Sequence, residues 1–467
     1  MPDLRPYQVQ LIAQARAALR SHRRVLLQAP TGSGKTVIIG NIFASAAAKA
    51  SRGLFIVHRV ELIEQTRATF AEFGIPHGII AANYDPDPAR AIQIASIDTL
   101  KARLKRGLAT DYKLVAWDEC HHIAAAGWKR VATALPHAFH IGLTATPQRL
   151  DGAGLKHAFD TMVCGPAVAE LIAAGWLSPF KAYAPTLPDL SGLKTRMGDF
   201  VHAEVAMDKP SITGDAVGHY LRLAAGKRAL AFCASIEHSR NVAASFTAAG
   251  VPARHVDGET PRDERKAAMA AFREGSVHVL TSVDIFGEGV DVPAMEAAIL
   301  LRPTKSLALH LQQCGRALRP QPGKTALVID HAGNCHRHGL PDDARTWTLD
   351  GRVKRPGVTD APVKQCPQCF AVCRAPVLAC PECGFEFPVK PRIVAEVAGE
   401  LTPFERRARG FEESQAKSLA DWQAIARKRG YKPGWAFYRW RAREQRNRPD
   451  AENSGGHIGD RSATVQK

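Results

Sequence analysis

The stretch VLLQAPTGSGKTVII at residues 25–39 decides the fold of the first part of this chain. Its apolar start predicts a buried strand, its apolar end predicts the opening of a helix, and a glycine-rich turn joins them. Gly32 and Gly34 let the backbone turn its N–H groups toward phosphate oxygens, and the helix N-terminus adds partial positive charge. We therefore expect a phosphate-binding loop rather than an empty turn, formed by Thr31, Gly32, Ser33, Gly34, Lys35 and Thr36. Lys35 can reach the β- and γ-phosphates of a nucleoside triphosphate, and the Thr36 hydroxyl can bind Mg²⁺.

Short apolar runs alternate with helical patterns on either side of this loop. The predicted strands are 25–28, 54–58, 91–95, 114–117 and 140–143, followed by a second set at 229–233, 277–281, 297–301 and 326–329. Helical patterns cover 236–249, 261–274 and 306–318. Continuous apolar runs are typical of strands that are buried on both faces. The fold class is therefore α/β, with two tandem parallel-sheet domains.

Composition limits the class of protein. The chain has 467 residues, too many for one hydrophobic core, and its net charge of +17 favours a polyanionic partner such as nucleic acid. It has no run of 18 apolar residues, and its first residues lack the apolar segment of a signal peptide. We therefore expect a cytoplasmic protein with no membrane partner. Five of the ten cysteines are scattered, as is typical of reduced thiols: Cys120, Cys164, Cys233, Cys314 and Cys335.

An acidic pair, Asp118 and Glu119, directly follows the predicted strand 114–117. Two carboxylates at a strand end suit Mg²⁺ binding by Asp118 and activation of an attacking water by Glu119. The alternative is a surface pair that caps a helix, but the phosphate loop nearby favours hydrolysis.

Further motifs in the same order resemble those of superfamily 2 helicases across residues 4–334. They are LRPYQ at 4–8, DECH at 118–121, TATP at 144–147, TSVDIFGEGVDVP at 281–293 and QQCGRALR at 312–319. Within that superfamily, the LRPYQ start, the DECH sequence and a later cysteine cluster resemble the RadD-like DNA repair helicases and related phage and prophage helicases. Two positions depart from the usual pattern: Cys120 stands where alanine is commoner, and Gln313 stands where arginine or lysine is frequent.

The resemblance implies two RecA-like domains, at 1–165 and 226–345, joined by a connector at 166–225. It assigns the adenine contact to Gln8 and nucleotide-facing positions to Gly289 and Asp291. It also assigns coupling between the ATP and nucleic-acid sites to His121, Thr144 and Thr146. The catalytic set that it implies is Lys35, Asp118, Glu119, Gln312, Arg316 and Arg319. The two arginines would cross the cleft and stabilise charge on the transferring phosphate.

Two Cys-x-x-Cys pairs, Cys366/Cys369 and Cys380/Cys383, stand ten residues apart. This spacing predicts a structural zinc ribbon at 360–390, with these four thiolates as ligands. Disulfide pairing is the alternative, which a reducing compartment disfavours. Cys373 is a spare thiol that we leave out of the ligand set.

The C-terminal part predicts a basic, partly helical module at 391–450 and a disordered tail at 451–467. Residues 391–448 contain 14 Lys and Arg against 7 Asp and Glu, and aromatic and basic residues interleave at 428–441. Such a mixture suits phosphate contacts with base stacking, but the aromatic residues could equally form the core of a small helical hairpin.

The sequence as a whole predicts an ATP-dependent helicase or translocase, with ATP, Mg²⁺ and structural Zn²⁺ as cofactors. Its partner is nucleic acid, with DNA favoured over RNA, in repair, recombination or replication; protein partners would bind through the zinc ribbon or the tail. Two alternatives stay open: an ATP-gated clamp, and a subunit of a restriction or defence system that moves along duplex without separating strands.

Overall fold

The computed structural model describes residues 3–58, 61–108, 110–122, 125–149, 152–185, 187–196, 198–283, 295–351, 363–375, 377–388, 412–432 and 434–446. The chain divides into two compact units, Met1–Val389 and Lys390–Lys467. No described helix is long and apolar enough to cross a membrane.

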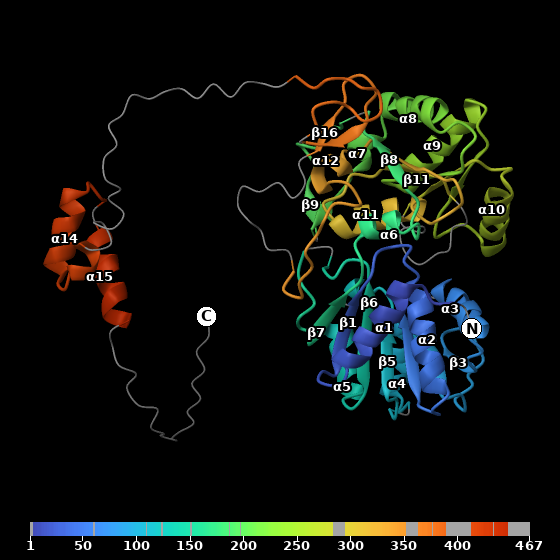
Figure 1. Ribbon diagram of the computed structural model, residues 1–467, viewed down its shortest axis with the longest axis horizontal. Coiled ribbons are helices and arrows are strands. Elements are labelled where there is room, and N and C mark those ends of the chain that lie inside the picture. The colour runs from blue at the N-terminus through green and yellow to red at the C-terminus, as the bar shows by residue number, and fades with distance from the viewer. Residues whose placement is uncertain are drawn as a thin grey trace, which may run out of the picture. The chain divides into compact units, whose positions relative to one another are not determined.

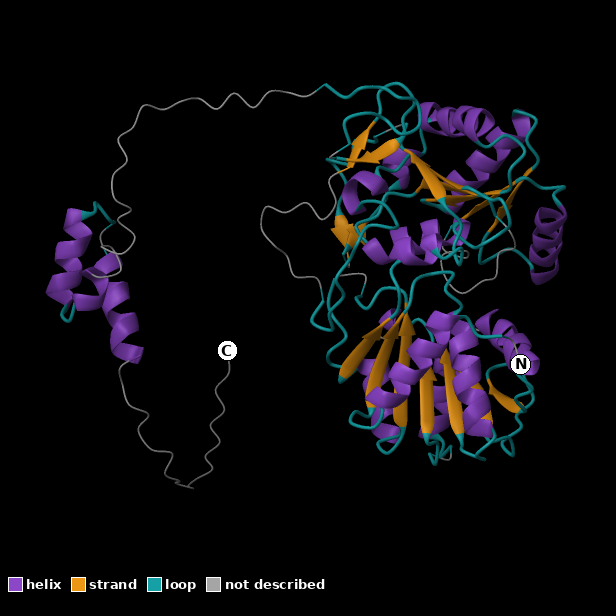
Figure 2. Ribbon diagram, in the orientation of Figure 1, coloured by secondary structure: helices purple, strands orange, loops and turns teal. Residues whose placement is uncertain are grey.

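The first domain is built on a parallel sheet of strand order β3-β4-β2-β5-β6-β1-β7 (Figures 1 and 2). Its strands are β1 (Arg24–Gln28), β2 (Gly53–Val57), β3 (His77–Ile80), β4 (Ile92–Ser96), β5 (Leu114–Trp117), β6 (Phe139–Thr144) and β7 (Thr161–Cys164). The helices are α1 (Pro6–Ala18), α2 (Lys35–Ala47), α3 (Glu61–Glu72), α4 (Ile97–Lys105) and α5 (Ala125–Ala134). The central strands are buried on both faces, which explains their continuous apolar sequence.

Each face of the first sheet has its own apolar core. On one face, α1, α2 and α3 pack on the sheet around Phe43 and Phe70. On the other face, Trp117 and Phe159 pack with residues of α4 and α5. The two cores hold β1, β5 and β6 side by side, so that the loops after these strands share one edge of the sheet.

The second domain has a parallel sheet of strand order β12-β13-β11-β14-β15-β8. Its strands are β8 (Phe180–Tyr183), β11 (Ala229–Cys233), β12 (Ala253–Val256), β13 (Val279–Ser282), β14 (Ala297–Leu301) and β15 (Ala326–Asp330). The helices are α6 (Val168–Ala173), α7 (Glu204–Met207), α8 (Pro210–Leu223), α9 (Ile236–Ala248), α10 (Arg262–Glu274), α11 (Leu307–Ala317) and α12 (Asn334–His338). A short antiparallel pair, β9 (Thr195–Arg196) and β10 (Asp199–Phe200), precedes α7.

A small cysteine-rich ribbon extends the core of the second domain. Its strands β16 (Val363–Gln365) and β17 (Val372–Arg374) pair antiparallel. Cys366, Ala371 and Cys380 are buried in the same apolar cluster as Tyr183 of β8. The backbone N–H of Ala184 donates to the carbonyl of Phe370 at 3.0 Å, and Lys181 pairs with Glu382 at 2.5 Å. The ribbon is therefore packed on the second domain rather than separate from it.

Residues 349–351, which follow the second domain in sequence, lie against the first domain. The backbone N–H of Lys156 donates to the carbonyl of Leu349 at 3.0 Å, and Gly351 forms a β-bridge with Ala153. The segment after α12 thus contacts both domains.

The second unit contains a helical hairpin, α14 (Leu419–Lys428) and α15 (Trp435–Arg446). Ser418 caps α14: its hydroxyl accepts from the backbone N–H of Asp421, whose carboxylate accepts from the Ser418 N–H. The predicted disordered tail at 451–467 lies outside the described residues.

The prediction of two tandem parallel sheets followed by a ribbon and a helical module is confirmed. The predicted strands and helices are present with end shifts of one or two residues, as in β13 and α11. The predicted strands do not include β3, β7, β8 and β12, of four residues each, or the shorter strands β9, β10, β16 and β17. Of these, β8 lies inside the predicted connector 166–225 and forms one edge of the second sheet.

The contact between residues 349–351 and the first domain depends on Gly154. A Cβ at that position would lie 2.0 Å from the Leu349 carbonyl oxygen, so Gly154→Ala must displace backbone. We expect a loss of about 1–3 kcal/mol in unfolding free energy, measured by thermal or denaturant unfolding. Gly192→Ala is the matched control, because a Cβ there meets nothing within 4 Å. Equal stability of the two variants would show that this contact is not part of the folded state.

Candidate active site

The phosphate loop connects β1 to α2 and has the backbone geometry that phosphate binding requires. Gly32 and Gly34 have φ values of +84° and +79°, a region that residues with a Cβ rarely adopt. Lys35 and Thr36 begin α2, so their N–H groups lie at the positive end of the helix. The Ser33 hydroxyl is buried without a hydrogen-bond partner in the described chain. Such a group fits a loop that is built to contact another molecule.

Helix α1 holds the loop from one side. The side-chain amide of Gln8 donates to the Ser33 carbonyl at 3.0 Å, and the Tyr7 hydroxyl donates to the same carbonyl at 2.6 Å. The other end of the Gln8 amide accepts from the Arg5 backbone N–H at 2.9 Å. A Cβ on Gly34 would lie 2.7 Å from the Gln8 amide nitrogen, so glycine is needed there for space as well as for φ. Gln8 therefore connects the predicted adenine-reading segment to the phosphate loop.

The acidic pair stands at the end of β5, next to the loop. Lys35 Nζ lies 3.4 Å from Glu119 Oε1, and both side chains are 11% exposed. Glu119 has a φ of +41°, a costly backbone conformation for a residue with a side chain. Burial, together with the charge of Glu119, raises the pKa of Asp118 to about 6. Two carboxylates confined beside one lysine form a site that favours additional positive charge.

A chain of polar contacts runs from this pair to the second domain. His121 Nδ1 lies 3.5 Å from Glu119 Oε2 and 2.8 Å from the Thr144 hydroxyl. That hydroxyl donates to the Thr146 carbonyl and accepts from the Thr146 N–H. On the far side of the ring, His121 Nε2 lies 3.4 Å from Nε2 of Gln312, which is on α11. The structure thus brings together the predicted coupling residues and one residue of the QQCGRALR motif.

Helix α11 packs directly on the phosphate loop. A Cβ on Gly315 would lie 2.6 Å from the Cβ of Thr31, so only glycine permits this approach. Arg316 is 4% exposed, and Arg319 is half-buried with its Cγ on the side of Gly32. Arg316 therefore lies on the helix that faces the loop, and Arg319 follows two residues after the end of that helix.

Two predicted nucleotide-facing residues, Gly289 and Asp291, lie outside the described residues, which stop at 283 and resume at 295. The strand before that gap, β13, is described. The Thr281 hydroxyl donates to the Ser239 carbonyl at 2.8 Å and accepts from the Ser239 hydroxyl at 2.9 Å.

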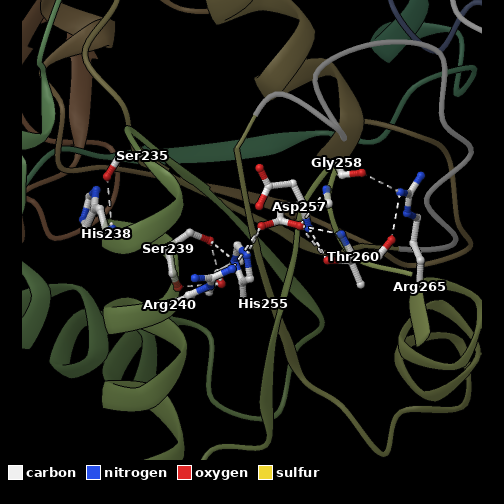
Figure 3. Close-up of polar contacts among 11 residues, drawn as sticks. Ser235, His238, Ser239, Arg240, His255, Asp257, Gly258, Thr260 and Arg265 are labelled. Carbon is white, nitrogen blue, oxygen red and sulfur yellow. Dashed lines mark hydrogen bonds and ion pairs between the residues drawn. The ribbon is translucent and has the colours of Figure 1, made fainter. Parts of the chain in front are cut away.

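A polar network at the ends of β12 and β13 was missed by sequence reasoning (Figure 3). Ser239 Oγ lies 2.7 Å from His255 Nδ1, and His255 Nε2 lies 2.9 Å from Asp257 Oδ2. Burial alone would raise the pKa of Asp257, but hydrogen bonds from His255 and Thr260 lower it to about 2. The signal that the sequence offers here is the turn-forming stretch DGET at 257–260, which matches none of the helicase motifs.

A cavity lies beside the phosphate loop, and a segment without helix or strand forms part of its lining. A cavity of about 320 Å³ is lined by Thr31 and Ala145 of the first domain, by Leu311 and Gly315 of α11, and by residues between 341 and 347. Sequence periodicity could not identify the last group, because these residues lie in a segment without helix or strand.

The four predicted zinc ligands come together in the ribbon. The ligand atoms of Cys366, Cys369, Cys380 and Cys383 all lie within 4.8 Å of one another. Two of the sulfur pairs, Cys366–Cys383 and Cys369–Cys380, are 3.5 and 3.6 Å apart. A tetrahedral zinc with bonds of about 2.3 Å requires sulfurs roughly 3.8 Å apart, so this set fits the ion. Cys373 is buried outside the group, and its thiol points to the Ala371 carbonyl at 3.8 Å.

Comparisons with known proteins agree with this architecture. The family model described as "Type III restriction enzyme, res subunit" matches residues 1–149, and "Helicase conserved C-terminal domain" matches residues 213–321. The 51.5 kDa protein of Lactococcus phage (isolate 7-9) is 37% identical over 372 residues, which is 79% of each chain. The DNA 3'-5' translocase XPB2 of Sulfurisphaera tokodaii is 25% identical over 374 residues, covering 70% of this chain and 81% of that protein.

The ATP-dependent helicase IRC3 of Saccharomyces cerevisiae is 30% identical over 356 residues, which is 71% of this chain; the match spans about half (52%) of the yeast protein. Among solved structures, a fragment of the HsdR subunit of a type I restriction enzyme from Vibrio vulnificus YJ016 shares the fold with a TM-score of 0.60. It is 21% identical, and the match covers 74% of this chain and 66% of that one. With two parallel-sheet domains and the described motif residues His121 and Gln312 in contact between them, the chain belongs to the superfamily 2 helicases, enzymes that hydrolyse ATP to act on nucleic acid.

Proposed function

We propose that this helicase couples ATP hydrolysis to directional movement along DNA. The observation that supports it best is the polar chain from Glu119 through His121 to Gln312. It connects a carboxylate of the first domain to a helix of the second through contacts of 3.5 and 3.4 Å. A change at the phosphate end can therefore alter the position of α11, which is what a motor with two domains requires.

The first domain would bind the nucleotide and activate water. The loop N–H groups and Lys35 would hold the phosphates, Gln8 would contact adenine, and Thr36 and Asp118 would hold Mg²⁺. The ion would supply charge neutralisation on the β- and γ-phosphates. The raised pKa of Asp118 fits this role, because a nearby cation favours the carboxylate that burial disfavours. Glu119 would accept the proton of the attacking water once Lys35 turns from it toward phosphate.

The second domain would complete the site. Arg316 lies on the helix that packs on the loop and Arg319 lies just after the end of that helix, where guanidinium groups would stabilise charge on the transferring phosphate. Gly289 and Asp291 remain predicted nucleotide contacts. The network at Ser239, His255 and Asp257 would fix the ends of β12 and β13, from which the segment with these two residues departs.

DNA is the favoured track for two reasons. The net charge of +17 suits a polyanion, and the XPB2 relative is named as a DNA translocase. Roles in repair, recombination or replication, and a cytoplasmic location, belong to the same proposal. The closer likeness to RadD-like helicases stays a prediction.

A second candidate is a duplex translocase that does not separate strands, as in a restriction system. The match of residues 1–149 to the res subunit model favours it. A strand-displacement assay combined with a triplex-displacement assay distinguishes the two: a helicase releases the paired strand, whereas a duplex translocase releases only the third strand.

Removing the hydrolytic groups should abolish turnover. We expect Lys35→Ala and Glu119→Gln to lower DNA-stimulated ATP hydrolysis by at least about a hundredfold, because a general base alone contributes 10²- to 10⁴-fold. Phosphate release with and without single-stranded DNA measures this. Lys49→Ala and Glu72→Gln, both exposed, are the matched controls. Wild-type turnover in either site variant would refute the assignment.

Zinc should hold the ribbon together. We expect Cys366→Ser and Cys380→Ser to lower bound zinc from about one equivalent to near zero and to lower the unfolding temperature, since the ribbon shares a core with the second domain. Metal analysis and thermal unfolding check this. Cys373→Ser, which alters a buried cysteine outside the set, should keep its zinc. Equal zinc content in all three variants would exclude the four-cysteine site.

A further inference from the structure

The second unit folds around its own small core. Trp422 and Ile425 of α14 and Ala436 of α15 are buried, and Trp435 and Trp440 pack against them. The rings of Trp422 and Trp435 are 5.8 Å apart. Three tryptophans thus pack between the two helices. This is the alternative, stated above, in which aromatic residues form the core of a small helical hairpin.

Other aromatic residues of the hairpin border this core but remain exposed: the Tyr431 ring lies 4.4 Å from that of Trp435, and the Phe437 ring lies 6.1 Å from that of Trp440. Tyr438 is 73% exposed, Phe437 is 44% exposed, and Tyr431 is 40% exposed. Elsewhere in the described chain, the exposed large hydrophobic residues include one aromatic residue, Phe139, whose ring is covered by the Arg23 guanidinium at 5.3 Å. Exposed aromatic side chains therefore concentrate in this short unit, which marks an interaction surface.

The charged side chains of the hairpin also fall into two groups, those in ion pairs and those exposed without one. Glu412 and Glu413 are neutralised by Lys428, Arg429 and Arg439 at 2.5 to 3.1 Å. Arg427, Lys432 and Arg441 are exposed and form no ion pair with the described residues. These two acidic groups are thus neutralised within the hairpin. Glu444, three residues after Arg441, is the one acidic residue of α15 and is exposed, so the remaining surface carries more cations than anions.

Exposed rings and free cations meet on α15. Arg441 follows Phe437 by four residues and Tyr438 by three, so all three side chains share one side of the helix. The rings of Phe437 and Tyr438 are 6.1 Å apart and nearly perpendicular. Aromatic rings beside guanidinium groups suit base stacking with phosphate contact, and stacking requires bases that are not paired.

From this arrangement we infer that the surface of Phe437, Tyr438 and Arg441 binds single-stranded DNA. The inference rests on the proposed function for the identity of the track, and it adds a second contact with that track outside the two motor domains. Phe437 and Tyr438 each offer a ring to an unpaired base, while Arg441 contacts the phosphates between them.

The test uses the full chain and a labelled oligo(dT) strand, compared with a duplex of the same length at several salt concentrations. Phe437→Ala/Tyr438→Ala should weaken binding to the single strand about tenfold, with little change for duplex. The salt dependence should stay the same, because stacking releases no counterions. Arg441→Ala should instead lower the slope of log affinity against log salt by about 0.7. The swap Phe437→Tyr/Tyr438→Phe keeps both rings and should bind normally.

Two outcomes would overturn the inference: unchanged single-strand affinity in the alanine variant, or equal losses of affinity for single strand and duplex. Unchanged affinity together with an altered oligomeric state would indicate a protein-docking surface instead. ATP hydrolysis without DNA should not change in these variants. The proposed function is judged separately. The wild-type protein could show no DNA-stimulated ATP hydrolysis while the alanine variant binds single-stranded DNA more weakly than wild type. In that case the motor assignment would fail, and the assignment of this surface would stand.

Discussion

The close approach of helix α11 to the phosphate loop is the contact on which the site depends. It exists because residue 315 has no side chain: a Cβ there would be 2.6 Å from the Cβ of Thr31. Gln312 and Arg316 lie on the same helix, one turn before Gly315 and directly after it. If α11 moved away by the width of a methyl group, the 3.4 Å contact between Gln312 and His121 would be lost as well. The absence of a side chain at residue 315 thus sets how closely the residues of α11 approach the phosphate loop.

Parallel strand order explains why residues distant in sequence meet. The strands β5, β6 and β1 are neighbours, so the segments after them, which contain Glu119, Thr146 and Lys35, lie along one edge. The second sheet repeats the arrangement: β12 and β13 are neighbours, and their ends carry Asp257 and Thr281. Polar groups collect at these edges because the strands themselves are buried on both faces and leave no other place for them.

The sequence predicted those parts in which local pattern and chemistry coincide. The phosphate loop, the acidic pair and the cysteine pairs are each short, and each needs particular residue types at fixed spacing. Contacts that depend on three-dimensional packing could not be found in this way. Nothing in the sequence around Gln8 shows that its amide holds the Ser33 carbonyl, and nothing near β8 shows that this strand belongs to the second sheet. Glu119 was predicted as a base, but its positive φ arises from the turn after β5 and is visible only in the structure.

The segment that follows α12 is attached to both domains. Residues 339–351 could span about 40 Å if extended, so chain length alone imposes no limit. Arg345 shortens that reach, because its guanidinium binds the carbonyls of His338, Leu340 and Asp343 and keeps the segment coiled. Arg374 of the ribbon adds ion pairs of 2.7 and 3.3 Å to Asp342 and Asp343. The attachment to the first domain combines an exposed ion pair between Lys156 and Asp350, backbone contacts of Leu349 and Gly351, and packing of the Leu349 side chain on the core around Trp117 and Phe159. Because the ribbon shares its core with the second domain, we expect it to move with that domain, and we expect the contacts at 349–351 to change when the two domains separate.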